Sequence, residues 1–358
     1  MGAIVPRSER GRGACTRCQG KHSGQRFAWN FPEPHNRNKT QSNERFRFAS
    51  STFCGIPDSA AALVIALAWK SELKIILLAL IITSSLFAQK AQVDPTWLHR
   101  SIPLQDEAAT LASGTCSYKA IFGKGDSDKH VLRTVTQFGE LKLGPRSKCQ
   151  TVLYERQEEI YFVLNGNAIL HFAERKYPMR TNDFTYVPPR VNHSLANHSD
   201  TPLHVLMMGF RIPEKVSVGA PQDPKIVNLN DVKEETVGGH PASVLYKLLI
   251  GSRTATRDAI DQAYIVTSFF WMDFAPAGTN APHHHEGAEE IYLVMDGAGE
   301  MVAGSGMDGV EGRYPAKAGD AYYFRPNCTV GFYNQNEPGA KAHILAVRAR
   351  IPPPDEDD

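Results

Sequence analysis

The feature that most constrains this chain is an internal repeat. Residues 118–123 (YKAIFG) return as residues 246–251 (YKLLIG), and residues 158–166 (EEIYFVLNG) return as residues 289–297 (EEIYLVMDG). The repeated segments keep their order along the chain, which indicates that a whole domain is duplicated rather than a short structural unit. Each copy is roughly 120 to 140 residues long, the size of an ordinary single domain.

Both copies consist of short segments that are typical of β-strands. Residues 159–164, 183–187 and 265–270 are rich in Val, Ile, Tyr and Phe, and Gly, Pro, Asn and Asp separate such segments from one another. Many short strands at regular spacing predict an all-β sandwich or barrel. We therefore expect two tandem β-domains, one over residues 94–220 and one over residues 221–358.

The residues that precede the first copy differ in character. Residues 1–88 carry 12 Lys and Arg against 5 Asp and Glu, whereas residues 89–358 carry 27 against 33. Residues 73–88 combine Lys74, an apolar run too short to cross a bilayer, and a small residue at Ala88, which is the pattern of a secretory signal peptide. A membrane anchor is the alternative. We interpret residues 1–72 as a disordered or non-native leader and expect a periplasmic or secreted protein.

A group of residues in the second copy is suited to a transition metal. His283 and His285 are two apart, so on a strand they share one face while His284 points to the other. Glu290 begins the next segment and can return to the same pocket. Two imidazoles and one carboxylate suit Fe, Mn, Zn, Ni or Cu. A surface cluster of histidines is the alternative interpretation.

The same residues resemble the first motif of the cupin superfamily, in which Gly, His-x-His, Glu and Gly follow one another. Four residues separate His285 from Glu290, and six separate Glu290 from the next motif glycine. The second cupin motif aligns on Gly319 and Asn334, but Val330 stands where the family has a histidine as its fourth metal ligand. The resemblance implies two tandem cupin domains, each a double-stranded β-helix or jelly-roll barrel, in one bicupin chain.

The first copy has lost the complementary part of the ligand set. It keeps Glu159 of the first motif and His193 of the second, whereas Val152 and Tyr154 stand at the two histidine positions. Two of four ligands remain, so we expect a degenerate site in this copy and one divalent metal in the other.

Three further residues of the second copy are candidates for catalysis. If Glu290 faces the barrel interior, strand alternation places Tyr292 there too. Arg325 lies in the second motif, near the expected mouth of the pocket. Arg348 lies on the last strand, where an inward guanidinium would hold a carboxylate or another oxyanion. A surface position at the end of the chain is the alternative for Arg348.

The cupin resemblance implies a metal-dependent enzyme that acts on a small molecule. Two histidines and one carboxylate form the ligand set of many dioxygenase-type iron enzymes. A non-redox metal enzyme (hydrolase, isomerase or decarboxylase) and a non-catalytic small-ligand-binding bicupin are the alternatives. A carboxylate is one candidate substrate, and a homo-oligomer is compatible with the sequence. The acidic mature body does not favour nucleic acid, and we expect no membrane contact after signal cleavage.

Overall fold

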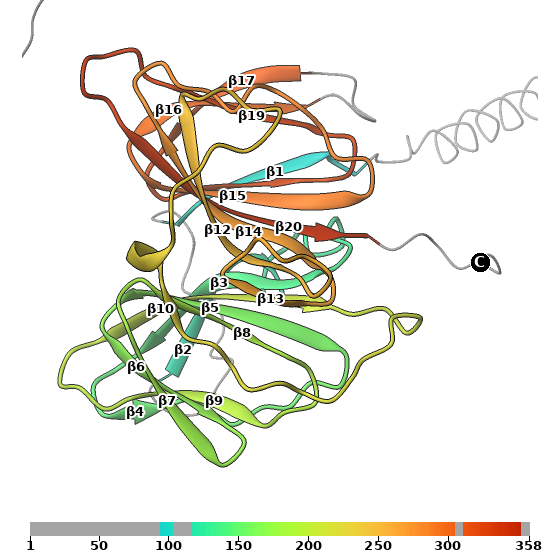
Figure 1. The fold of residues 1–358 in the computed structure, drawn as a ribbon, viewed down its shortest axis with the longest axis vertical. Helices are drawn as coiled ribbons and strands as arrows, with labels where there is room; N and C mark the ends of the chain where they lie inside the picture. The colour runs from blue at the N-terminus through green and yellow to red at the C-terminus, as the bar shows by residue number, and fades with distance from the viewer. Residues whose placement is uncertain (1–93, 103–115, 305–310, 352–358) are drawn as a thin grey trace, which may run out of the picture. The chain divides into compact units, whose positions relative to one another are not determined.

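The computed structural model describes residues 94–102, 116–304 and 311–351, which form two β-barrels (Figure 1). The predicted leader and signal peptide lie outside the described residues. Within these ranges the regular structure is strand, apart from the 3₁₀ helix η2 (Leu229–Asp231). No helix in the described residues is long and apolar enough to cross a membrane. The predicted all-β class is confirmed.

The first barrel pairs a larger sheet of strand order β11-β8-β5-β10-β3-β2 with a smaller sheet of order β4-β9-β6-β7. The strands of the larger sheet are β2 (Cys116–Gly123), β3 (Val135–Leu143), β5 (Gln157–Asn165), β8 (Asp183–Val187), β10 (Leu203–Arg211) and β11 (Val227–Asn228). Those of the smaller sheet are β4 (Ser147–Lys148), β6 (Asn167–Phe172), β7 (Arg175–Arg180) and β9 (His193–Asn197).

The second barrel repeats this plan, with a larger sheet of order β1-β18-β15-β20-β14-β12-β13 and a smaller one of order β17-β16-β19. The larger sheet contains β1 (Trp97–Ser101), β12 (Val244–Ser252), β13 (Ile260–Ala263), β14 (Val266–Phe274), β15 (Ala288–Asp296), β18 (Asp320–Phe324) and β20 (Ala342–Arg350). The smaller sheet contains β16 (Ala298–Gly304), β17 (Glu311–Lys317) and β19 (Thr329–Asn334).

Two strands belong to the barrel on the other side of the expected domain boundary between residues 220 and 221. β1 pairs antiparallel with β18 of the second barrel, with Trp97 opposite Phe324. β11 pairs antiparallel with β8 of the first barrel, with Val227 opposite Phe184. Each barrel thus contains one strand from the residue range that the sequence predicted for the other barrel.

The larger sheets are buried on both faces. In β20, Ile344 and Ala346 belong to the core inside the second barrel, whereas Leu345 and Val347 belong to a core that both barrels share. Successive side chains of a strand point to opposite faces, so an unbroken apolar run can fill both cores. The two barrels are therefore packed together through their larger sheets.

A buried glutamate from each barrel fastens this interface. The carboxylate of Glu158 accepts hydrogen bonds from the backbone N–H groups of Tyr264, Ile265 and Val266 at 2.6, 2.9 and 2.8 Å. It also accepts one from the Tyr186 hydroxyl at 2.9 Å. Burial raises the pKa of Glu158, and these donors act in the opposite direction.

The second barrel makes the reciprocal contact with Glu289. Its carboxylate accepts hydrogen bonds from the backbone N–H groups of Arg133, Thr134 and Val135 at 2.9, 2.6 and 2.7 Å, and from the Tyr323 hydroxyl at 2.7 Å. A buried carboxylate is stable only when such donors satisfy it. The first glutamate of each repeated Glu-Glu pair is therefore structural.

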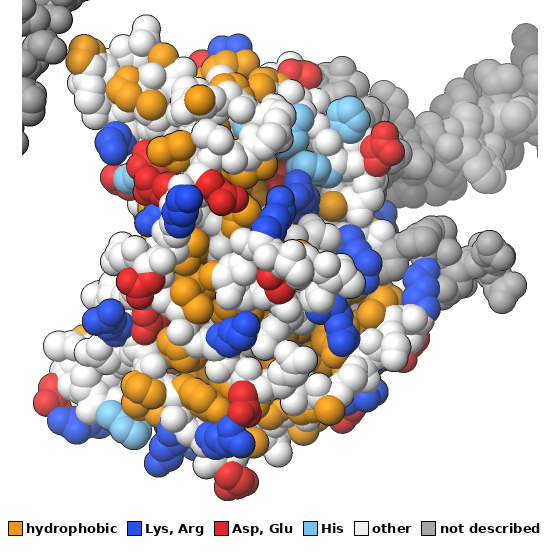
Figure 2. All heavy atoms as spheres, viewed as in Figure 1, with side chains coloured by type: hydrophobic (Ala, Val, Ile, Leu, Met, Phe, Trp, Pro, Cys, Tyr) orange, Lys and Arg blue, Asp and Glu red, His pale blue; other side chains and the backbone are white. Residues whose placement is uncertain are grey.

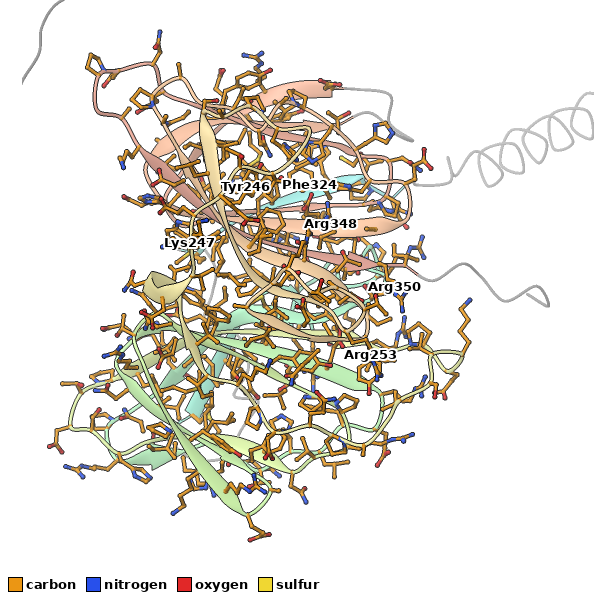
Figure 3. The ribbon with its side chains drawn as sticks, in the orientation of Figure 1. Tyr246, Lys247, Arg253, Phe324, Arg348 and Arg350 are labelled. Carbon is orange, nitrogen blue, oxygen red and sulfur yellow. A yellow bond between two sulfur atoms is a disulfide. The ribbon has the colours of Figure 1, made fainter. Side chains whose placement is uncertain are left out.

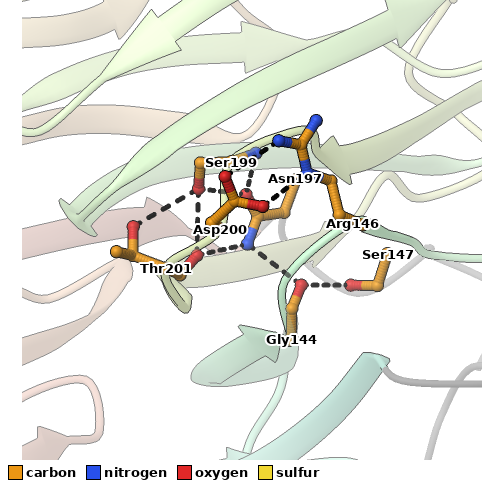
Figure 4. Close-up of polar contacts among 7 residues, drawn as sticks. All are labelled: Gly144, Arg146, Ser147, Asn197, Ser199, Asp200 and Thr201. Carbon is orange, nitrogen blue, oxygen red and sulfur yellow. Dashed lines mark hydrogen bonds and ion pairs between the residues drawn. The ribbon is translucent and has the colours of Figure 1, made fainter.

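The last residue of the second cupin motif is structural as well (Figure 4). Asn197 Nδ2 donates to the carbonyl oxygens of Leu143, Gly144 and Thr201 at 3.2, 3.0 and 2.8 Å. Asn334 donates in the same way to three carbonyl oxygens of the second barrel. Both asparagines tie strand ends together, which explains why both copies keep them.

The three cysteines of the described residues have different surroundings. Cys116 on β2 and Cys149 after β4 form a disulfide with 5.3 Å between their Cα atoms. Cys328 is buried in the second barrel, and its thiol donates to the carbonyl oxygen of Gly304 at 3.3 Å. The Cys328 thiol is therefore engaged with the backbone.

Candidate metal centre

The three predicted metal ligands meet in the second barrel. Their donor atoms all lie within 4.8 Å of one another. His283 forms an isolated antiparallel bridge with Val330, and the N–H of Asn327 donates to the carbonyl oxygen of His285 at 2.9 Å. The loop that carries both histidines is thereby held against β19, while Glu290 projects from the start of β15.

The backbone sets the tautomer of His283. Its Nδ1 lies 2.8 Å from the carbonyl oxygen of Ala281, and only a protonated Nδ1 can donate there. Nε2 is then left with a lone pair, the form in which imidazole binds a metal. Burial lowers the pKa of His283 and so favours the neutral ring. This side chain is prepared to act as a ligand.

Glu290 is the residue that most strongly indicates a cation site. It is 1% exposed, and neither carboxylate oxygen has a hydrogen-bond donor in the described part of the chain. His285 Nε2 lies 3.3 Å from Oε2, at ion-pair distance but outside hydrogen-bond geometry. Burial by itself raises the pKa of Glu290, but His285 and the charge of Arg348 outweigh it and leave the pKa below its ordinary value. An ionised buried carboxylate beside two imidazoles fits a divalent transition metal.

A pocket lined by His283 and Glu290 opens beside these residues. Tyr292 and Arg348, both predicted from the sequence, line it, and Tyr292 Oη accepts a hydrogen bond from Asn280 Nδ2 at 2.9 Å. Arg325 is not among the lining residues; its Nη1 lies 4.0 Å from Asp94 Oδ2. Tyr292 and Arg348 therefore line the same pocket as two of the predicted metal ligands, and Arg325 does not.

Tyr246 also lines the pocket, although the sequence analysis did not assign it a role (Figure 3). Its buried hydroxyl has no hydrogen-bond partner among the described residues. Burial, and then the charge of Glu290, raise the pKa of Tyr246, so the hydroxyl stays protonated. Tyr246 begins the second copy of the repeated YK segment, so the repeat contained a signal that could have identified it.

His240 and Arg257 are two further polar lining residues that sequence reasoning missed. The ring centroid of His240 lies 5.1 Å from that of His283, and its Nδ1 donates to the carbonyl oxygen of Asn280 at 2.7 Å. No motif marks either residue, because both lie in connecting segments that the tertiary structure brings to the pocket. Figure 2 shows histidine side chains gathered at the upper right of this face, with basic side chains just below them.

At the corresponding position of the first barrel, protein groups satisfy the carboxylate of Glu159. His193 Nε2 lies 3.0 Å from Glu159 Oε2, the Tyr161 hydroxyl donates to Oε2 at 2.6 Å, and Gln157 Nε2 donates to Oε1 at 2.8 Å. Burial by itself lowers the pKa of His193, but the hydrogen bond and charge of Glu159 raise it overall. A protonated His193 therefore stands where a metal would otherwise satisfy the carboxylate.

Backbone pairing supports the motif alignment between the copies. Val152 bridges His193 in the first barrel, and His283 bridges Val330 in the second. Each barrel thus has one histidine and one valine at the same pair of positions, with their order exchanged. The ligand losses deduced from the sequence fall on equivalent places in the two barrels.

Comparison with known proteins agrees with this architecture. Residues 141–209 and 270–347 match the family model of the cupin domain. A putative glyoxylate-induced protein from Pseudomonas aeruginosa has a similar structure, with a TM-score of 0.57 and 14% identity over 75% of this chain and 95% of that one. The oxalate decarboxylase of Lactobacillus farciminis, solved as a formate complex, has a TM-score of 0.51 and 12% identity over 72% of this chain and 86% of its own.

A sequence relative covers a shorter region. An uncharacterized protein of Methanocaldococcus jannaschii is 29% identical over 63 residues, which are 17% of this chain. The chain spans about half the length of that curated relative, 50%. The two segments that match the cupin domain each fall within one barrel, so the chain carries two cupin domains.

Proposed function

We propose that this chain is a metal-dependent enzyme whose second barrel acts on a small carboxylate, with a dioxygenase-type reaction as the first candidate. The observation that carries the proposal is the Glu290 carboxylate, which is buried, has no hydrogen-bond donor among the described residues and lies close to His283 and His285. A bound metal would supply a Lewis acid and, if it is iron, a site for O₂.

The pocket lining supports an anionic substrate. Arg348 presents a guanidinium next to the ligands, and Arg257 adds a second one to the lining. A guanidinium binds a carboxylate through two parallel hydrogen bonds. Tyr246 has a protonated hydroxyl free to donate to a second oxygen of the substrate. The solved relative from Lactobacillus farciminis binds formate, a small carboxylate, on the same fold.

The composition of the pocket supports access of the substrate to the metal. Val330 occupies the position of the fourth ligand in the cupin motif and offers no donor atom. A catalytic metal needs an open position of this kind. We assign Arg348 to hold the carboxylate, Tyr246 to donate to a substrate oxygen, and Tyr292, held by Asn280, to shape the wall.

We also propose that the mature protein is exported to the periplasm or secreted. Residues 73–88 have the pattern of a signal peptide, and the disulfide between Cys116 and Cys149 is the type of bond that persists in oxidising compartments. Fractionation of the cells that produce the protein, with mass spectrometry of its N-terminus, tests this localisation. Recovery of an uncleaved protein in the cytoplasm would contradict it.

The decisive experiment is elemental analysis of the purified protein and of His283→Ala and His285→Ala. We expect close to one transition metal per chain in the unsubstituted protein and little in either variant. His284→Ala is the matched control, because His284 is adjacent and exposed, and it should keep the metal.

The identity of the metal then separates the reaction classes. Iron with O₂ uptake on addition of small carboxylates supports the dioxygenase-type reaction. Zinc or manganese without O₂ uptake supports a non-redox hydrolase, isomerase or decarboxylase. A protein without any metal that still binds small carboxylates would contradict the enzymatic proposal and support a ligand-binding bicupin.

A further inference from the structure

Arg348 lies on β20 beside the predicted metal ligands, and its contacts differ from those of Arg146 in the first barrel and of Arg350 on its own strand. Arg146 pairs with Asp200 at 2.8 Å, and Arg350, two residues further along β20, donates to the carbonyl oxygen of Tyr264 at 3.0 Å. In the described part of the chain, no carboxylate lies within ion-pair distance of Arg348. Its Nε donates to the hydroxyl of Thr267 at 3.4 Å, and its Nη1 lies 3.1 Å from Nε2 of His285.

The guanidinium of Arg348 therefore stands against a predicted metal ligand. Arg348 is also the register partner of Glu290 across β15 and β20. A metal ion that binds His285 and Glu290 would have this fixed positive charge as a close neighbour. Like charges repel strongly at short range when water is largely excluded, so Arg348 by itself weakens metal binding.

In the first barrel, the register position opposite the glutamate holds no cation. Gly209 is the register partner of Glu159, as Arg348 is of Glu290. The arginine thus accompanies the metal-type ligand set and is missing where His193 fills the site. The other cation of the pocket is already compensated, because Arg257 Nε lies 3.5 Å from Asp258 Oδ2. Of the two pocket arginines, Arg348 is the one with no carboxylate at ion-pair distance in the described residues.

From this arrangement we infer that an anion held by Arg348 tightens metal binding, so that the metal and the anionic substrate bind cooperatively. A carboxylate on the guanidinium cancels the repulsion that the metal would otherwise experience. By thermodynamic linkage the metal must then strengthen anion binding by the same factor. The inference rests on the proposed metal site and adds a form of regulation: the metal binds fully only when an anionic substrate, such as a carboxylate, is also bound.

The test measures the affinity for Mn²⁺ from the electron paramagnetic resonance signal of the free ion. Each protein is titrated in chloride and in acetate at equal ionic strength. In the unsubstituted protein, acetate should tighten Mn²⁺ binding by about fivefold or more, the lower end of ordinary coupling between sites. Arg348→Gln should bind Mn²⁺ more tightly in chloride than the unsubstituted protein does, and acetate should have no further effect on it.

Arg350→Gln is the matched control, because it removes the same charge from the same strand and should respond to acetate as the unsubstituted protein does. Thermal melts without metal verify that each variant folds, and Arg348→Met replaces Arg348→Gln if the latter does not. Weaker Mn²⁺ binding in Arg348→Gln, or an acetate effect that survives in it, would overturn the inference while leaving the metal site intact. Failure of every protein to bind Mn²⁺, with no other metal bound, would overturn the proposed function as well.

Discussion

Glu159 and Glu290 occupy the same position of the repeat and have opposite surroundings. Glu159 is satisfied by His193, Tyr161 and Gln157, whereas Glu290 has no hydrogen-bond donor in the described residues. Both carboxylates are almost completely buried, at 1% exposure. A buried carboxylate must be neutralised or paired. In the first barrel, side chains of the protein pair with it; in the second, we expect a cation to do so.

Single positions account for this divergence. Tyr292 corresponds to Tyr161 of the first barrel, but its hydroxyl is bonded to Asn280 rather than to the glutamate. At the same offset, Asn280 corresponds to Cys149, which is bound in the disulfide. Asn280, in the segment between β14 and β15, thus holds the Tyr292 oxygen, whereas the Tyr161 hydroxyl donates to Glu159. The comparison teaches that the equivalent tyrosine donates to the carboxylate in the barrel without the metal-type ligand set and not in the other.

The largest effect that this comparison predicts is on the stability of the first barrel. His193→Ala removes the charge that pairs with Glu159, and breaking a buried pair costs roughly 3 to 5 kcal/mol. Urea unfolding measures the loss, and His198→Ala, at an exposed histidine one residue beyond the same strand, is the control. A loss below about 1 kcal/mol, or a loss of bound metal with stability unchanged, would show that His193 does not play this role.

The next largest effect is on metal binding in the second barrel. Glu290→Ala should weaken the affinity for the resident metal by at least about 100-fold, because loss of a mere outer-shell partner already costs about 10- to 100-fold. Glu159→Gln, the matched change in the first barrel, should leave the affinity unchanged. Metal titration followed by calorimetry distinguishes the two. Metal binding that depends on Glu159 instead would reverse the assignment of the barrels.

A smaller effect is expected when the ligand set of the second barrel is extended. Val330→His places an imidazole at the position that His193 occupies in the first barrel, across the bridge from His283. A fourth ligand should tighten metal binding by roughly tenfold, about 1.4 kcal/mol. Val330→Ala, which adds no donor atom, should show no gain. An unchanged affinity in Val330→His would indicate that the bridge does not direct this side chain at the metal.

The smallest predicted effect is a pH dependence of stability that belongs to the first barrel. The pKa of His193 is raised above its unfolded value of about 6.5, because the hydrogen bond and charge of Glu159 outweigh burial. This pair therefore contributes its full stability below pH 6.5 and loses it as the pH rises through the raised pKa. Urea unfolding of the unsubstituted protein and of His193→Gln across this range should give a difference that shrinks toward high pH. A difference that grows with pH would contradict the protonated state of His193.

Much of the fold could be predicted because its signals are local or repeated. Strand alternation and turn residues predicted the all-β class, and the two copies of the EEIY segment predicted the two cupin barrels, all of which is confirmed. The spacing of His283, His285 and Glu290 predicted a common site, and the structure brings these three side chains together. A strand fixes which face a residue occupies, so these inferences need no knowledge of distant segments.

Other features depended on contacts between segments far apart in the sequence, and only the tertiary structure decided them. The pairing of β1 with the second barrel, the reciprocal capping by Glu158 and Glu289, and the separation of Arg325 from the pocket that Arg348 enters are examples. The sequence by itself determined where the carboxylates lie on the strands. Which donors reach them is decided by packing, because a hydrogen bond forms only where folding brings its partners within about 3 Å.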